Sequence, residues 1–265
     1  GAIQQLETWI TGAVGELKEV DSILTEISKT SNLTNTQLKQ LGSDAFDQAS
    51  VYGKKASDYL LGIQEMSRSG YYGKNAENMA NLSVLAQAAG DLTSDTANSY
   101  LLASNAAYNY PGNVEKLNAV LDGQNEITNK NSVSMEDMAA ATTKAASMAS
   151  EMGVAEDSLS AMIGTIEART KASGEEVGTG IKSLLINLQN INNSKIVSTL
   201  DKAGISMTEL KDGVEQMRDP ISILEDLQKV FNSLDESDPL RSEILTNIGQ
   251  KYHAKVCVAV QKCAA

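Results

Sequence analysis

The sequence predicts an all-α protein, a multi-helix bundle of helical hairpins with an N-terminal heptad helix. Apolar residues recur at helical spacing in several segments, whereas runs that alternate Val, Ile, Thr and aromatic residues are nearly absent. Aromatic residues make up only 4% of the 265 residues, and only three prolines interrupt the chain. Apolar residues make up 42%, so a chain of this length has enough of them to bury a core.

The first segment carries a heptad pattern. Its apolar members follow one another at alternating spacings of three and four residues. Leu17 and Leu24 at a positions, with Val20 and Ile27 at d positions, favour three or four strands over a parallel dimer. We therefore expect an oligomer seam; the alternative is a long amphipathic helix packed on its own domain. The seam residues are Ile3, Leu6, Ile10, Ala13, Leu17, Val20, Leu24 and Ile27.

A polar break at residues 32–35 precedes the next helical region. Thr34 or Asn35 is expected to cap a helix that runs through about Tyr52, and helical spacing continues to Ser67. The residues from Tyr72 to Ala106 then resemble a helix pair that lies 80 positions later in the chain. This similarity predicts two alike helical units, and chance matching between alanine-rich helices is the alternative.

That later helix pair follows an alanine-rich helix expected over residues 134–152. The first helix of the pair is predicted over about residues 156–168 and has an apolar stripe on one face. Ser173 is then expected to cap the second helix, whose first turn is acidic. Gly178 and Gly180 lack side chains near its start, so another helix is expected to approach closely there.

Two further helices are predicted by the same signal. Asp219 and Asp238 each precede a proline, which suits an N-cap acid followed by proline at the first helical position. On these patterns the chain divides into a heptad segment at 1–50, a first helical unit at 51–130, a second helical unit at 131–254, and an uncertain tail at 255–265.

An ordered series of motifs resembles the core region of phage tail tape measure proteins. The series contains SGEEVGTGIKSL from residue 173, AGIS from residue 203, DPISILEDL from residue 219 and IGQKYH from residue 248. It extends over about residues 134–254. The resemblance implies a protein that occupies the lumen of the tail tube, helps to set tail length and assemble the tail, and is released when DNA is ejected.

The same resemblance implies where the chain acts and with what. Its expected partners are further copies of itself, as a trimer or a multiple of three, and the tail tube, tail tip and tail assembly proteins of a phage or prophage. Its expected location is the virion tail lumen, and the host cytoplasm during assembly. The chain is short for a whole tape measure protein, so we expect a fragment that contains the compact core region.

Composition and motifs exclude several other functions. A net charge of −12 without a basic cluster argues against a nucleic-acid surface, because phosphate contacts need grouped Lys and Arg. No signal peptide and no membrane span are expected. The single histidine, His253, has no nucleophile motif nearby, and the six-residue spacing of Cys257 and Cys263 does not suit zinc. We therefore expect no enzyme, cofactor or metal. The alternative to a tail component is a helical adaptor or a secretion-effector-like binding module.

Overall fold

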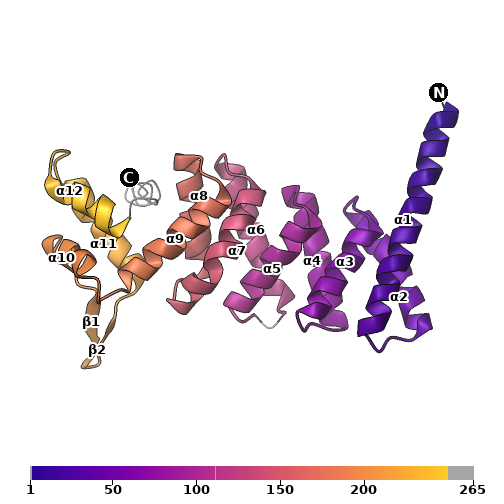
Figure 1. Cartoon of the computed structure of the whole chain (residues 1–265), viewed down its shortest axis with the longest axis horizontal. Coiled ribbons are helices and arrows are strands. Elements are labelled where there is room, and N and C mark those ends of the chain that lie inside the picture. The colour runs from indigo at the N-terminus through magenta and orange to yellow at the C-terminus, as the bar shows by residue number, and fades with distance from the viewer. Residues whose placement is uncertain (1, 111, 250–265) are drawn as a thin grey trace. The chain divides into compact units, whose positions relative to one another are not determined.

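The computed structural model describes residues 2–110 and 112–249 of the chain, and its elements are labelled in Figure 1. These residues form twelve α-helices, one π-helical segment and one small β-hairpin, so the all-α prediction is confirmed. The helices of the first half are α1 (Ala2–Thr30), α2 (Asn35–Val51), α3 (Ala56–Arg68), α4 (Lys74–Gly90), α5 (Ser94–Ala107) and α6 (Val114–Lys130). The elements of the second half are α7 (Met135–Glu151), α8 (Glu156–Thr170), α9 (Gly174–Leu188), α10 (Ser194–Lys202), β1 (Thr208–Lys211), β2 (Val214–Met217), α11 (Pro220–Ser233), α12 (Pro239–Glu243) and the π-helical segment η1 (Ile244–Ile248).

The chain divides into two compact units. Of the described residues, unit 1 contains 2–102, 110 and 112–118, and unit 2 contains 103–109 and 119–249. Helices α5 and α6 therefore each contribute to both units. The predicted segments 1–50, 51–130 and 131–254 divide the chain at other points and stay a prediction, and the predicted tail lies outside the described residues.

Unit 1 has its core where α1, α2, α3 and α4 meet. Thr34, one of two predicted caps, begins α2 with a reciprocal capping box, in which its side chain and that of Gln37 each accept from the other residue's backbone N–H. The predicted helical region to Ser67 is interrupted between α2 and α3, where Gly53 has a φ of 65° that a helix cannot include. The buried apolar residues are Val20, Ile23, Ile27, Leu41, Ala45, Ala49, Ala56, Tyr59, Leu60, Ile63, Ala80 and Val84.

The helix pair α4–α5 and the helix pair α8–α9 share their inner boundaries at an offset of 80 residues, since α4 ends at Gly90 and α8 at Thr170. Helix α5 begins at Ser94 and helix α9 at Gly174. Each pair has a left-handed residue after its first helix, Asp91 with a φ of 52° and Lys171 with a φ of 54°. The backbone therefore has the same helix–turn–helix arrangement at both places, and the internal repeat itself stays a prediction.

Unit 2 is built around α7, which packs along α9 and also contacts α8. The alanines of α7 face this packing: Ala139, Ala141, Ala145, Ala146 and Ala149 are all fully buried. Such small side chains let the helix axes approach closely. The later helices α10, α11 and α12 continue the unit, and Ile196, Leu200, Ile223 and Leu227 are buried among them.

The hairpin of β1 and β2 was not predicted. Its two strands pair antiparallel, with Thr208 opposite Met217 and Lys211 opposite Val214. Asp212 and Gly213 form the turn with φ values of 52° and 77°, the two positive values that a two-residue type I′ turn requires. The Asp-Gly pair was therefore a readable hairpin signal in an otherwise helical sequence.

Candidate interaction sites

The described residues contain no group of side chains suited to bind a metal ion. Over residues 2–110 and 112–249, no three His, Cys, Asp or Glu side chains are grouped so that they could bind a metal ion. Within the same ranges, none of the helices has the length and apolar character that crossing a bilayer requires. His253, Cys257 and Cys263 lie outside the described residues. Two exposed features of the described residues, the first half of α1 and the β-hairpin, are candidate surfaces for protein contact.

The second half of the predicted heptad seam packs inside unit 1. Val20 and Ile27 are buried in the core with α2 and α3, and Leu24 is half-buried against the same core. A Cβ atom added to Gly42 of α2 would lie 2.9 Å from Leu24 Cδ1, so the two helices are in close contact. These three residues of the seam already have a partner within their own chain.

In the first half of the heptad stripe, the described side chains are more exposed than Val20 and Ile27. Leu17 is 56% exposed and its neighbour Val14 is 45% exposed, while Ala13 is half-buried. The side chains of Ile3, Leu6 and Ile10 are not among those described. Large apolar side chains are normally withdrawn from water, so an exposed pair on one helix is a candidate contact surface. The second half of the stripe therefore fits the alternative of a helix packed on its own domain, and the oligomer seam stays a prediction.

Close packing of α9 on α7 depends on missing side chains. A Cβ atom on Gly178 would lie 2.6 Å from the Ala141 carbonyl oxygen, closer than real Cβ atoms come. Gly180 is buried in the same helix. The tightest approach, at Gly174, was not singled out from the sequence: its Cβ would lie 2.1 Å from the Asp137 carbonyl oxygen. No side chain can be accommodated there without moving a helix.

Asp137 joins the starts of two helices. Its Oδ1 accepts a hydrogen bond from the Gly174 backbone N–H at 2.8 Å, and its Oδ2 accepts one from Ser134 Oγ at 2.7 Å. The nearby carboxyl group of Glu167 is only 3% exposed. Burial, and to a smaller extent the charge of Asp137, raise the pKa of Glu167 to about 8. This side chain is therefore mainly protonated at neutral pH, which the sequence did not predict.

The three predicted caps lie at the starts of helices. Ser173 Oγ accepts from the Glu176 N–H at 3.3 Å at the start of α9. Asp219 accepts from the Ile221 N–H at 3.2 Å at the start of α11, and Asp238 accepts from the Leu240 N–H at 2.8 Å at the start of α12. In each case the side chain satisfies a backbone donor that the helix itself leaves without a partner.

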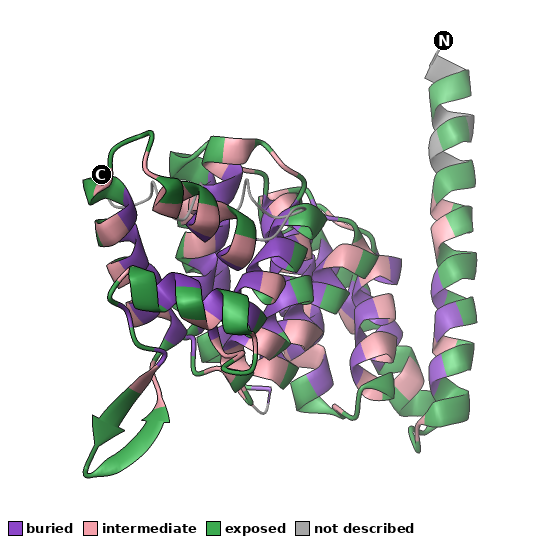
Figure 2. Ribbon diagram, turned by 60° about the vertical axis from the view of Figure 1, so that its left-hand side comes forward, coloured by how far each residue is buried: buried purple, intermediate pink, exposed green. Residues whose placement is uncertain are grey.

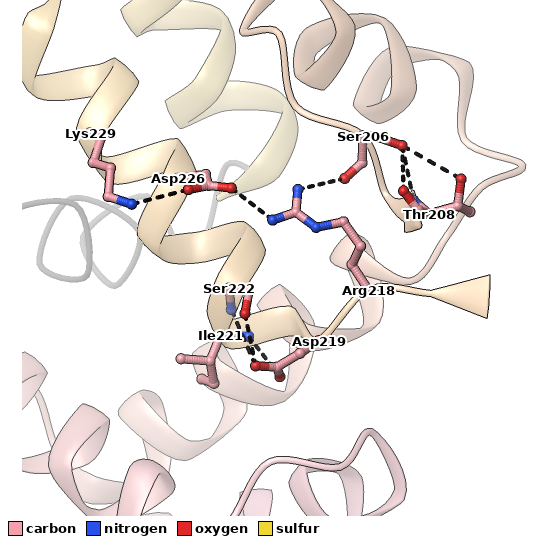
Figure 3. A network of polar contacts seen from close by, with 8 residues as sticks. All are labelled: Ser206, Thr208, Arg218, Asp219, Ile221, Ser222, Asp226 and Lys229. Atoms are coloured by element: carbon pink, nitrogen blue, oxygen red, sulfur yellow. Dashed lines mark hydrogen bonds and ion pairs between the residues drawn. The ribbon is translucent and has the colours of Figure 1, made fainter. Parts of the chain in front are cut away.

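The hairpin has a polar base, shown in Figure 3. The Arg218 guanidinium donates to the Ser206 carbonyl oxygen at 3.1 Å and to Asp226 Oδ2 at 2.7 Å, so it ties the chain before β1 to helix α11. Lys229 donates to the other oxygen of Asp226 at 3.2 Å. The hydrogen bonds from Arg218 and Lys229 lower the pKa of Asp226, which keeps this carboxylate charged. The base is thus fixed to the helical body.

Beyond this base the hairpin is solvated. Figure 2 shows it as an exposed ribbon that projects from the helices of unit 2. Leu210 is 78% exposed and Val214 is 66% exposed, and they lie on opposite faces because successive residues of a strand alternate. An isolated two-stranded hairpin in water is marginally stable. A hairpin with a fixed base and two exposed apolar side chains is therefore a candidate contact surface.

Comparison with known proteins identifies the family. No solved structure matches the chain. The family model described as "Phage-related minor tail protein" matches residues 47–249, which covers most of the chain from α2 to the end of η1. The match includes the glycine-dependent packing of α7 on α9 and the hairpin. By this match over residues 47–249, the chain belongs to the family of phage-related minor tail proteins.

Proposed function

We propose that this chain is the compact core of a tail tape measure protein, which lies in the lumen of the tail tube, contributes to tail length and assembly, and leaves when DNA is ejected. The observation that carries the proposal is the family match over residues 47–249, together with the ordered motifs from residue 134 to 254. A minor tail protein is a structural component of the virion tail. The tape measure role is the more specific statement and is what needs testing.

The helix α1 fits one end of a length-setting rod. It is an α-helix of 29 residues in which most of the described side chains ahead of Val20 are exposed, and a helix rises about 1.5 Å per residue. The other helices of the two compact units have at most 17 residues and are separated by short turns, which suits a plug or anchor. We therefore assign length-setting to helical chain that continues the direction of α1, and assembly contacts to the compact units.

Tail length is the direct test. An insertion of about 70 helical residues ahead of α1 in the phage gene should lengthen the tail by about 100 Å in electron micrographs, since each residue adds about 1.5 Å. An insertion of equal length into the loop between α6 and α7 serves as the control, because it should disturb the compact body without extending a rod. Tails of unchanged length with the first insertion would contradict the tape measure role and favour an adaptor.

We also propose self-association through the first half of α1, as a trimer or a multiple of three. The seam would use Ala13 and Leu17, with Ile3, Leu6 and Ile10 continuing it by their heptad positions. A closed symmetric plug inside a tube of threefold or sixfold symmetry would match that symmetry. The exposure of Leu17 and Val14 supports this shorter seam, because unit 1 leaves both side chains largely uncovered.

A single charge tests the seam. Leu17→Asp places a carboxylate at a central a position and should shift the sedimenting mass from an oligomer to a monomer, while the helical circular dichroism is kept. Ser22→Asp adds the same charge at an exposed position on the opposite face of α1 and should leave the mass unchanged. A wild-type chain that sediments as a monomer at high concentration would remove the seam, and it would leave the tail-length test unaffected.

A further inference from the structure

The open edge of β1 is defined by its hydrogen-bond pattern. The Arg218 N–H donates to the Met207 carbonyl oxygen at 2.9 Å, just below the hairpin. Because bonded and non-bonded pairs alternate along an antiparallel ladder, Glu209 and Lys211 also direct their backbone groups toward β2. Leu210, which lies between them, therefore directs its N–H and C=O away from β2, toward the open edge.

Thr208 is the other residue of β1 whose backbone groups point away from β2, and both groups already have hydrogen-bond partners. The Thr208 N–H donates to Ser206 Oγ at 3.1 Å, and the Ser206 hydroxyl donates to the Thr208 carbonyl oxygen at 2.8 Å. Ser206 thus satisfies both outward backbone groups of Thr208, at the end of this edge that lies nearest the helices. The open part of the edge is consequently short and is centred on Leu210, whose side chain is 78% exposed. Unpaired backbone groups on an exposed strand edge favour pairing with another strand.

We propose that a second copy of this chain pairs with the open edge of β1, so that two hairpins form one four-stranded antiparallel sheet around a twofold axis at Leu210. The two Leu210 residues then exchange both of their backbone hydrogen bonds. Glu209 of each copy lies opposite Lys211 of the other, which gives two cross-strand pairs of opposite charge on the same small surface. This inference does not depend on the tape measure role.

The charges of β1 favour this register over the others that a twofold axis allows. An axis centred on Glu209 would set two carboxylates face to face, and one centred on Lys211 would set two ammonium groups face to face. An axis at Thr208 would compete with the bonds from Ser206. A twofold axis at Leu210 is therefore favoured over one at any other residue of β1. There the free backbone groups pair, the two leucine side chains meet, and each Glu209 faces a Lys211.

The contact is small, and a small contact is transient in solution. It can be trapped by a disulfide in full-length chain in which Cys257 and Cys263 are first replaced by serine. In the proposed sheet the two Leu210 Cα atoms lie about 5.5 Å apart, which is within the range that a disulfide spans. Leu210→Cys should therefore form a covalent dimer quickly under mild oxidation.

Val214→Cys is the matched control, because Val214 is similarly exposed but lies on β2. In the proposed sheet the two β2 strands are the outer ones, roughly 14 Å apart, which is three strand spacings. The Leu210→Cys chain should dimerise at least about tenfold faster than the Val214→Cys chain, since only the former has its sulfur atoms within bonding reach. Equal rates for the two variants would overturn the pairing.

Charge exchange tests the register. In the Leu210→Cys background, Glu209→Lys sets lysines opposite each other and should slow dimer formation several-fold. Adding Lys211→Glu restores opposite charges with their positions exchanged, and the rate should return. A double variant as slow as Glu209→Lys alone would show that these residues do not face each other and would overturn the proposed sheet.

Discussion

The backbone N–H of Gly174 donates to Asp137 Oδ1 at 2.8 Å, and the Gly174 Cα lies so close to the Asp137 backbone that an added Cβ would be 2.1 Å from its carbonyl oxygen. One acid thus holds the start of α9 against the start of α7, and the absence of a side chain makes the approach possible. The packing of α7 on α9, which is central to unit 2, is fixed at this point.

Gly174→Ala should destabilise unit 2 strongly. The atoms that the new methyl group meets belong to the backbone of α7, so the helix itself has to move, and overpacking of this kind costs about 1–3 kcal/mol or more. Gly123→Ala is the control, because a Cβ there meets nothing within 4 Å and should add up to about 1 kcal/mol of helix stability. Urea unfolding of both variants measures the difference, and similar stabilities would contradict the steric account.

The sequence allowed the helices to be predicted far better than their contacts. Caps such as Ser173 and Asp219 act locally, so residue type and spacing predict them. The use of Val20 and Ile27 inside unit 1 could not be predicted, because the heptad stripe is the same whether a helix packs on its own chain or on another copy. The closeness of Gly174 to Asp137 depends on residues 37 positions apart, and spacing within one helix contains no information about it.

Glu167 should make stability depend on pH. Its pKa is raised from an ordinary 4.5 to about 8, so the folded chain holds a proton that the unfolded chain releases between these values. Unfolding free energy should therefore fall as pH rises from about 4.5 to 8, by on the order of a few kcal/mol at most. Glu167→Gln should flatten this dependence and stabilise the chain at pH 8.

The repeat makes glutamine a natural replacement. Gln87 lies 80 residues before Glu167, at the matching position of α4, and is buried there as an uncharged amide. Thermal unfolding of the wild type and of Glu167→Gln, measured across this pH range, checks the prediction. Parallel pH profiles for the two chains would show that another group is responsible.

Asp219→Ala should cost about 1 kcal/mol of unfolding free energy, because it removes the acceptor for the Ile221 and Ser222 N–H groups at the start of α11. Asp219→Asn keeps a side-chain oxygen of the same reach and should cost little. Chemical denaturation of the three chains is the measurement. Equal losses for alanine and asparagine would indicate that the charge of Asp219, rather than the cap, stabilises the helix.

Amino-acid composition does not predict an element as small as this hairpin. A low content of β-forming residues predicts the class of the whole chain correctly, but eight strand residues change such an average very little. The local signal was the turn, since Asp212 and Gly213 both adopt positive φ. The base could not have been predicted, because its ion pair joins Arg218, which follows β2, to Asp226 within α11, and no local spacing rule links these two positions.

Arg218→Ala should loosen the hairpin while the helices stay folded. The guanidinium group supplies both the bond to the Ser206 carbonyl oxygen and the ion pair with Asp226, so its loss removes the side-chain link between β1 and α11. Hydrogen exchange should become faster at the backbone amides of β1 and β2 and stay unchanged in α7 and α9. Lys229→Ala is the control, because the bond that Lys229 makes in Figure 3 goes to Asp226 on α11, whereas Arg218 also bonds to Ser206 ahead of β1. Unchanged exchange in Arg218→Ala would mean that the remaining bonds of the base, among them the one from the Arg218 N–H to the Met207 carbonyl oxygen and the one from Gln189 to the Arg218 carbonyl oxygen, hold it in place. The two strands would then stay ordered without the side chain, and the open edge at Leu210 would stay available for pairing.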